Sequence, residues 1–202
     1  MLPRGSKLNN MKKVNVLVLG LIATLGFSSC LKDDPFDESA QFELERPLVE
    51  EYATTHFDDP QFNEGLGIWF EVLEEGDPGS YEYKFVRNAN DPNQEYVEAP
   101  DVVVNYTLRR LDNTVIEEDD NVKFSLAGVI FAWQYAFLPQ QIDGRQITGL
   151  TPAGLKAGSK IRLVTPSRWA YRNSGTDDIP ANTPLAFDIE VLEIHAPDDG
   201  EE

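Results

Sequence analysis

The sequence predicts an α+β domain in which an antiparallel sheet wraps around one short helix. Residues 102–110 alternate between apolar and polar side chains, as a strand with one buried face does. Residues 185–194 repeat this alternation near the end of the chain. Between them, Val129 to Leu138 is apolar on every side, which favours a short helix packed against the sheet.

A short amphipathic helix is expected ahead of the sheet. Between residues 44 and 55 the apolar side chains Leu44, Leu48 and Tyr52 recur at four-residue spacing, with Val49 beside them. This spacing places them along one face, which we expect to be the buried one.

The first strand of the sheet is predicted at residues 67–74, where Ile68, Phe70 and Val72 alternate inward. A Gly-Asp-Pro-Gly segment then ends it. Residues 80–100 mix alternating aromatics with a run of turn formers, so a hairpin or a long loop is expected before the main sheet.

The main sheet is expected to begin at residue 101. Asp112-Asn113 indicates a tight turn into a return strand at Val115, and residues 124–126 predict a further short strand. In the last strand, Leu192 and Ile194 switch phase, which indicates a β-bulge. The side chains predicted to face the core are Val102, Val104, Tyr106, Leu108, Ile161, Leu163, Leu185, Phe187, Ile189 and Val191.

The beginning of the chain has the pattern of an export signal. Met11-Lys-Lys precedes an apolar run, which is too short for a comfortable spanning helix, and Ser28-Ser29-Cys30 follows. This predicts a signal peptide over residues 1–29, including an upstream extension. Its end resembles the lipobox of bacterial lipoproteins. Cys30, the only cysteine, cannot form an internal disulfide and is expected to carry a lipid anchor.

These patterns divide the chain into segments. The predicted segments are an acidic tether at 30–43, the helix, first strand and inserted hairpin at 44–100, the core at 101–195 and an acidic tail at 196–202. Leu31-Lys-Asp-Asp resembles the acidic signal that directs Bacteroidetes lipoproteins to the outer face of the outer membrane. The expectation is therefore a monomer in the cell envelope, lipid-anchored to the outer membrane, on its periplasmic or its surface-exposed face.

Charge and missing motifs exclude several function classes. The formal net charge of −18 repels phosphate backbones and argues against nucleic acid as a partner. His56 and His195 are the only histidines and lack a motif around them, so a histidine-activated nucleophile has no support. No zinc motif is present, and the acidic turns at 119–121 and 177–178 lack the spacing of a calcium loop. Neither a metal nor a cofactor is expected.

Several segments match one family pattern in chain order. Val102-Val-Val-Asn-Tyr106-Thr is similar to V-x-V-x-Y-T-G, and residues 124–133 are similar to F-x-L-x-x-V-I-x-G-W. Residues 158–171 resemble G-x-K-x-x-x-x-x-P-x-x-x-A-Y-G, and residues 179–191 resemble I-P-x-x-x-x-L-x-F-x-V-E-L. Each match is weak by itself, but together, over residues 65–194, they resemble the FKBP-type peptidyl-prolyl cis-trans isomerases.

The resemblance implies an FKBP-like half-barrel with an aromatic pocket that isomerises X–Pro bonds in peptides or unfolded exported proteins. Trp133 would form the pocket floor, with Tyr106 and Tyr171 as the other catalytic residues. The Tyr171 hydroxyl and the Ile130 N–H would donate to substrate carbonyls. The substrate-binding positions would be Ile116, Glu117, Phe124, Val129, Ile130, Ile179 and Phe187, with Ile116 and Glu117 standing where the family has Phe and Asp.

The chain departs from the family pattern at several points. Leu108 and Ala132 replace glycines, and Arg172 replaces the glycine of A-Y-G, near the expected pocket rim. A loop at 139–154 lengthens the segment after Trp133. In a rival alignment, residues 147–150 would supply the V-I-x-G-W element instead.

Two other functions stay open at this point. The chain could be a non-catalytic FKBP-fold module of an envelope lipoprotein that binds a peptide or partner through an altered pocket. Alternatively, an exposed Trp69 or Trp169 could bind a glycan.

Overall fold

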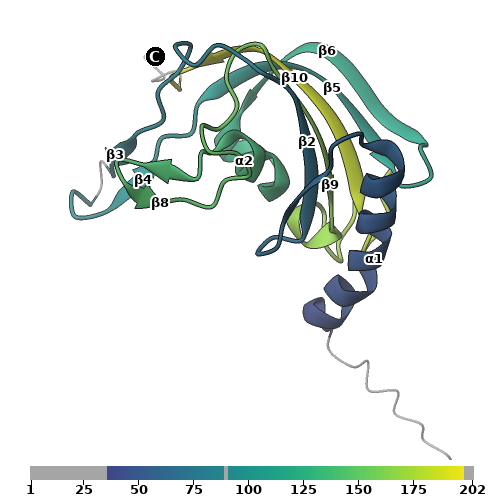
Figure 1. Ribbon diagram of the computed structural model, residues 1–202. Helices are drawn as coiled ribbons and strands as arrows, with labels where there is room; N and C mark the ends of the chain where they lie inside the picture. Colours follow the sequence, from purple (N-terminus) through teal and green to yellow (C-terminus); the bar gives the residue numbers. More distant parts are fainter. Residues whose placement is uncertain (1–35, 89–90, 198–202) are drawn as a thin grey trace, which may run out of the picture. The chain divides into compact units, whose positions relative to one another are not determined.

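The computed structural model describes residues 36–88 and 91–197 (Figure 1). The predicted leader, the lipidation site Cys30 and most of the acidic tail lie outside these residues. The helices are α1 (Glu38–His56) and α2 (Phe131–Phe137), with short 3-10 turns η1 (Leu126–Gly128) and η2 (Ser167–Trp169). The strands are β1 (Gln61–Asn63), β2 (Ile68–Glu75), β3 (Phe85–Arg87), β4 (Glu95–Val97), β5 (Asp101–Arg110), β6 (Val115–Ser125), β7 (Gln141–Ile142), β8 (Arg145–Gln146), β9 (Ser159–Thr165) and β10 (Leu185–His195).

Six strands form one antiparallel sheet in the order β1-β2-β9-β10-β5-β6. The sheet curves around α2, whereas α1 lies against its outer face (Figure 1). Successive side chains along each strand point alternately to the inner and the outer face of the sheet. Leu163 and Phe187 belong to the core under α2, whereas their neighbours Val164 and Ala186 pack with α1. The predicted α+β architecture, a sheet wrapped around a short helix, is confirmed.

The residues predicted to face the core are all buried there. The bulge expected near the end of the last strand is also present, as a register shift between Val191 and Glu193 in the pairing of β10 with β5. The tight turn after β5 contains Asn113, which has a positive φ of 66°. Sequence alternation therefore identified the inner face of this sheet correctly.

Helix α1 differs from its prediction in both start and face. It begins at Glu38, where the Asp37 side chain accepts hydrogen bonds from the N–H groups of Ser39 and Ala40, so part of the expected tether is helical. The expected buried leucines, Leu44 and Leu48, are 68% and 49% exposed. The buried side chains of α1 are Glu45, Val49, Tyr52 and Ala53. The buried face of the helix differs from the predicted one because Glu45 points inward and accepts hydrogen bonds from Ser167.

The remaining differences are local. The return strand and the short strand expected at 124–126 form one long strand, β6, which ends before η1. The inserted segments at 80–100 and 139–154 each contain a small hairpin, β3–β4 and β7–β8. Arg145 joins them, because its guanidinium lies over the Phe85 ring and its Nη1 is 3.0 Å from Glu95 Oε2. Within the part of the chain that the structure describes, no helix is long and apolar enough to cross a bilayer.

Candidate functional site

A cavity of about 380 Å³ opens on the inner side of the sheet. Strands β5, β6 and β10 form one side of it, the start of α2 forms another, and the turn after η2 contributes Tyr171. The residues lining the cavity are Tyr106, Leu108, Glu117, Asp119, Val122, Phe124, Gly128, Val129, Ile130, Trp133, Tyr171 and Phe187. The lining is mainly apolar, with a few polar groups, as is typical of binding sites for small ligands or short peptide segments.

The indole of Trp133 lies at the centre of an aromatic cluster. The rings of Tyr106, Phe124 and Phe187 meet it edge-on, with centroid separations of 5.3, 5.5 and 5.9 Å. Edge-to-face packing fixes ring orientation more strongly than area burial alone would. Trp133 is only 4% exposed, so the cluster gives the cavity a rigid apolar floor.

Hydrogen-bond donors surround this floor. Ile130 lines the cavity at the N-terminal end of α2, and among the described residues its N–H donates to no acceptor. The Trp133 Nε1 atom is buried and likewise has no partner there. Tyr106 and Tyr171 add two phenol hydroxyls. A bound carbonyl group could therefore be satisfied without displacing an internal hydrogen bond.

Both phenols are held in the protonated, donating form. Burial, hydrogen bonding with Glu117 and the charges of Glu117 and Asp119 raise the pKa of Tyr106 above its usual value. Burial, followed by the charge of Glu117, raises the pKa of Tyr171. Neither hydroxyl loses its proton near neutral pH, so the site offers neutral donors and no phenolate base.

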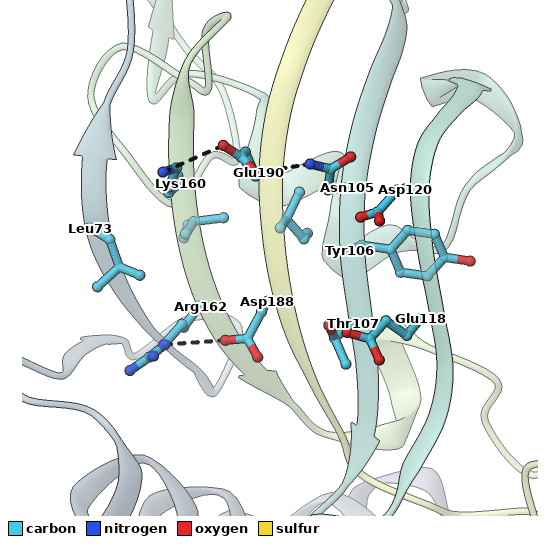
Figure 2. A pocket seen from close by; sticks show the side chains of 12 residues that line it. Leu73, Asn105, Tyr106, Thr107, Glu118, Asp120, Lys160, Arg162, Asp188 and Glu190 are labelled. Carbon is cyan, nitrogen blue, oxygen red and sulfur yellow. Dashed lines mark hydrogen bonds and ion pairs between the residues drawn. The ribbon is translucent and has the colours of Figure 1, made fainter.

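The alternation of β6 places its acidic residues on opposite faces of the sheet. Glu117 and Asp119 line the cavity, whereas Glu118 and Asp120 line a shallow groove on the outer face (Figure 2). Pairing of Leu108 with Glu117 and of Tyr106 with Asp119 fixes this register. The sequence reading treated residues 119–121 as a polar turn, and for that reason it missed Asp119 as a cavity residue.

Helix α1 is hydrogen bonded to the 3-10 turn that precedes Tyr171. Glu45, only 2% exposed, accepts hydrogen bonds from Ser167 N and Ser167 Oγ, each at 2.7 Å. The carbonyl of Ser167 in turn accepts from the N–H groups of Ala170 and Arg172, which flank Tyr171. The buried carboxylate of Glu45 therefore helps to fix the position of the backbone before and after Tyr171, which lines the cavity.

Arg172 does not obstruct the cavity. Its backbone is left-handed, with φ 53°, the region that glycine enters most readily and that the family motif fills with glycine. Its Nε donates to the Arg168 carbonyl, and its guanidinium lies 5.6 Å from the centroid of the Phe131 ring. The side chain therefore lies over Phe131, the first residue of α2, and it is not among the residues lining the cavity.

Most of the residues proposed from sequence meet in the cavity. Those that line it are Tyr106, Glu117, Phe124, Val129, Ile130, Trp133, Tyr171 and Phe187. Ile116 and Ile179 pack in or against the core without lining it. The rival alignment is wrong, since none of residues 147–150 reaches the cavity and Leu150 is buried in the core. Leu108, Val122 and Gly128 are additional lining residues.

The chain also matches known proteins. Residues 93–192 match the family model described as FKBP-type peptidyl-prolyl cis-trans isomerase. This segment belongs to that family. The FKBP-type isomerase FkpA of Escherichia coli K12 is 33% identical over 97 residues, which cover 46% of this chain and 30% of that protein. FkpA of Aeromonas hydrophila is 33% identical over 104 residues, covering 49% of this chain and 33% of that protein. The chain therefore spans about a third of the length of these curated relatives.

Two crystal structures share the FKBP-like fold. The peptidyl-prolyl isomerase of Pseudomonas syringae pv. tomato superposes with a TM-score of 0.51 at 23% identity, covering 80% of this chain and all but 2% of that one. FkpA of E. coli superposes with a TM-score of 0.52 at 24% identity, covering 78% of this chain and 64% of that one. The FKBP-like assignment thus rests on segment 93–192 by sequence and on most of the chain by fold.

Proposed function

We propose that this FKBP-type domain is a peptidyl-prolyl cis-trans isomerase. The observation that carries the proposal is the aromatic cavity over Trp133, where two donors, the Ile130 N–H and Trp133 Nε1, have no partner among the described residues. A proline ring fits an apolar aromatic floor, and the flanking carbonyl groups would accept from Tyr171 Oη and Ile130 N. The mechanism needs no nucleophile, metal or cofactor.

The cavity can lower the barrier to rotation through its polarity and shape. Rotation about the peptide bond costs about 18–20 kcal/mol because the planar amide loses resonance. The twisted amide has less charge separation than the planar one, so an apolar site that excludes water disfavours the planar ground state relative to it. Shortening a lifetime of about 100 s to about 1 ms requires roughly 7 kcal/mol. Desolvation, shape complementarity and one or two hydrogen bonds together would lower the barrier by this amount.

A protease-coupled assay on a prolyl peptide tests this function. Trp133→Leu removes the floor and is expected to lower kcat/KM at least tenfold. Tyr171→Phe removes one hydrogen bond and is expected to lower it about three- to tenfold. Tyr135→Phe is a matched control, because Tyr135 lies on α2 outside the cavity lining and loses the same hydroxyl. Peptide binding without catalysis in the wild-type chain would instead indicate a binding module.

We further propose that the domain works in the cell envelope as a lipid-anchored monomer that acts on proline-containing segments of exported proteins. The leader pattern and the single cysteine at position 30 support this. Cys30→Ala is expected to move the protein from the membrane fraction to the soluble fraction. Unchanged membrane association of that variant would count against the anchor, and protease shaving of intact cells would report the face.

A further inference from the structure

The charged residues that line the cavity are all acidic. Glu117 and Asp119 are exposed at its edge, and no lysine, arginine or histidine lines the cavity. Within residues 36–88 and 91–197, neither carboxylate forms an ion pair. The edge where a peptide would enter is therefore negatively charged and unbalanced.

On the outer face of the sheet, by contrast, the acids of β10 have cationic partners. Lys160 Nζ lies 3.4 Å from Glu190, and Arg162 Nε lies 3.2 Å from Asp188 (Figure 2). Lys160 Nζ also lies 2.9 Å from Glu74. Cations on β9 thus balance the acids of β10. At the cavity rim, no cation of this chain performs that role in the described structure.

The negative field reaches across the cavity. The charge of Glu117 contributes to the raised pKa of Tyr106 on β5 and also to that of Tyr171, which lies in the turn after η2. Any peptide lying between the two phenols would therefore experience the field of Glu117. Charges in such a position steer association and select partners more than they add raw affinity.

We propose that this site prefers X–Pro segments that carry a lysine or arginine next to the proline. The cation would lie against Glu117 and Asp119 while the proline ring rests on Trp133. An acidic residue at the same position would be repelled. This preference rests on the proposed isomerase function and specifies its substrate class.

The test uses two series of prolyl peptides, one varying the residue before proline and one the residue after it, as Lys, Leu or Glu. Isomerisation is followed by NMR exchange, which needs no coupling protease with a charge preference of its own. At low ionic strength, kcat/KM for the Lys peptide should exceed that for the Glu peptide about three- to tenfold in at least one series. At about 1 M salt, where the Debye length is about 3 Å, the preference should largely vanish.

Two charge-matched variants locate the effect. Glu117→Gln combined with Asp119→Asn should abolish the preference, measured as the ratio of kcat/KM for the Lys peptide to kcat/KM for the Glu peptide, whatever the variant does to the rate of the Leu peptide. Glu118→Gln combined with Asp120→Asn makes the same change of charge on the same strand but on the outer face, and it should keep the preference.

The outcomes separate the two proposals. Equal rates for Lys and Glu peptides in both series overturn the charge preference and leave the isomerase intact. Equal loss of the preference in both double variants also overturns it, because the whole chain's charge would then be the cause. No catalysis on any peptide overturns the isomerase function itself.

Discussion

The inner and outer faces of the sheet are made by the same strands, but they treat their polar groups differently. On the outer face, Asn105 donates to Glu190, and Arg162 pairs with Asp188. On the inner face, the Ile130 N–H and Trp133 Nε1 have no partner among the described residues. Unpartnered groups are costly when they remain buried. These outer-face groups are partnered within the chain, whereas the two unpartnered donors of the inner face leave places for the acceptor groups of a bound ligand.

The two faces also differ in the amount of apolar packing. The inner cluster joins all the long strands to α2. The outer cluster is smaller: its buried members are Val49, Tyr52, Ala53, Phe57, Val164 and Ala186, and Trp69 of β2 packs against them. Burial of apolar area is the main favourable term in folding. We therefore expect the inner face to dominate the free energy of unfolding and α1 to act locally.

The largest expected effect distinguishes the faces through adjacent residues of β9. Leu163 and Val164 are both fully buried, Leu163 in the inner cluster and Val164 under α1. Leu163→Ala is expected to lower the free energy of unfolding by about 2–5 kcal/mol, measured by urea denaturation. Val164→Ala removes less apolar volume and should cost roughly 1–2 kcal/mol. A Val164→Ala cost as large as that of Leu163→Ala would show that α1 packing is as important as the main core.

The second effect concerns the contact between α1 and the turn that carries Tyr171. Glu45→Ala leaves the Ser167 N–H and hydroxyl without an acceptor, which is expected to cost roughly 2 kcal/mol. It should also lower isomerase kcat/KM several-fold, because the turn carrying Tyr171 loosens. Glu45→Gln keeps an acceptor oxygen of similar size and should lose less in both measurements.

A double-mutant cycle identifies the route of this effect. If Glu45 acts through the Tyr171 turn, Glu45→Ala should change kcat/KM little in a Tyr171→Phe background. Fully additive losses would mean that Glu45 influences catalysis by some other path. Unchanged catalysis in Glu45→Ala, despite lower stability, would show that the two faces are functionally separate.

The sequence was sufficient wherever a local pattern decides the outcome. Alternation at 102–108 and 185–191 correctly predicted the inner faces. The order of the motifs correctly predicted that Tyr106, Trp133 and Tyr171 line one cavity. It failed where burial depends on a distant partner. Glu45 is buried because it bonds Ser167, 122 positions away, and no helical periodicity contains that information.

Asp119 is a different kind of omission. Residues 119–121 have no apolar side chain, so the sequence predicted a polar turn there, although they lie in the middle of β6. One face of this run meets solvent and the other meets the rim of a cavity, and both positions suit acids. Recognising 115–125 as one strand would have paired Asp119 with Glu117 on the same face.

The smallest effect is expected on the outer face and tests whether that face is independent. The hydrogen bond from Asn105, together with Lys160, lowers the pKa of Glu190 below its usual value of 4.5. Its stabilising contribution is therefore complete above pH 4.5 and is lost as the pH falls through the lower, folded-state pKa. Because the side chain is 39% exposed and solvent screens it, the contribution is expected to be only a few tenths of a kcal/mol, about the size typical of surface pairs. Urea denaturation of wild type and Glu190→Gln should show a small difference at pH 6 that shrinks as the pH falls below 4.5. The isomerase kcat/KM of Glu190→Gln should equal that of wild type, and a several-fold loss would show that the charged outer face controls the inner site.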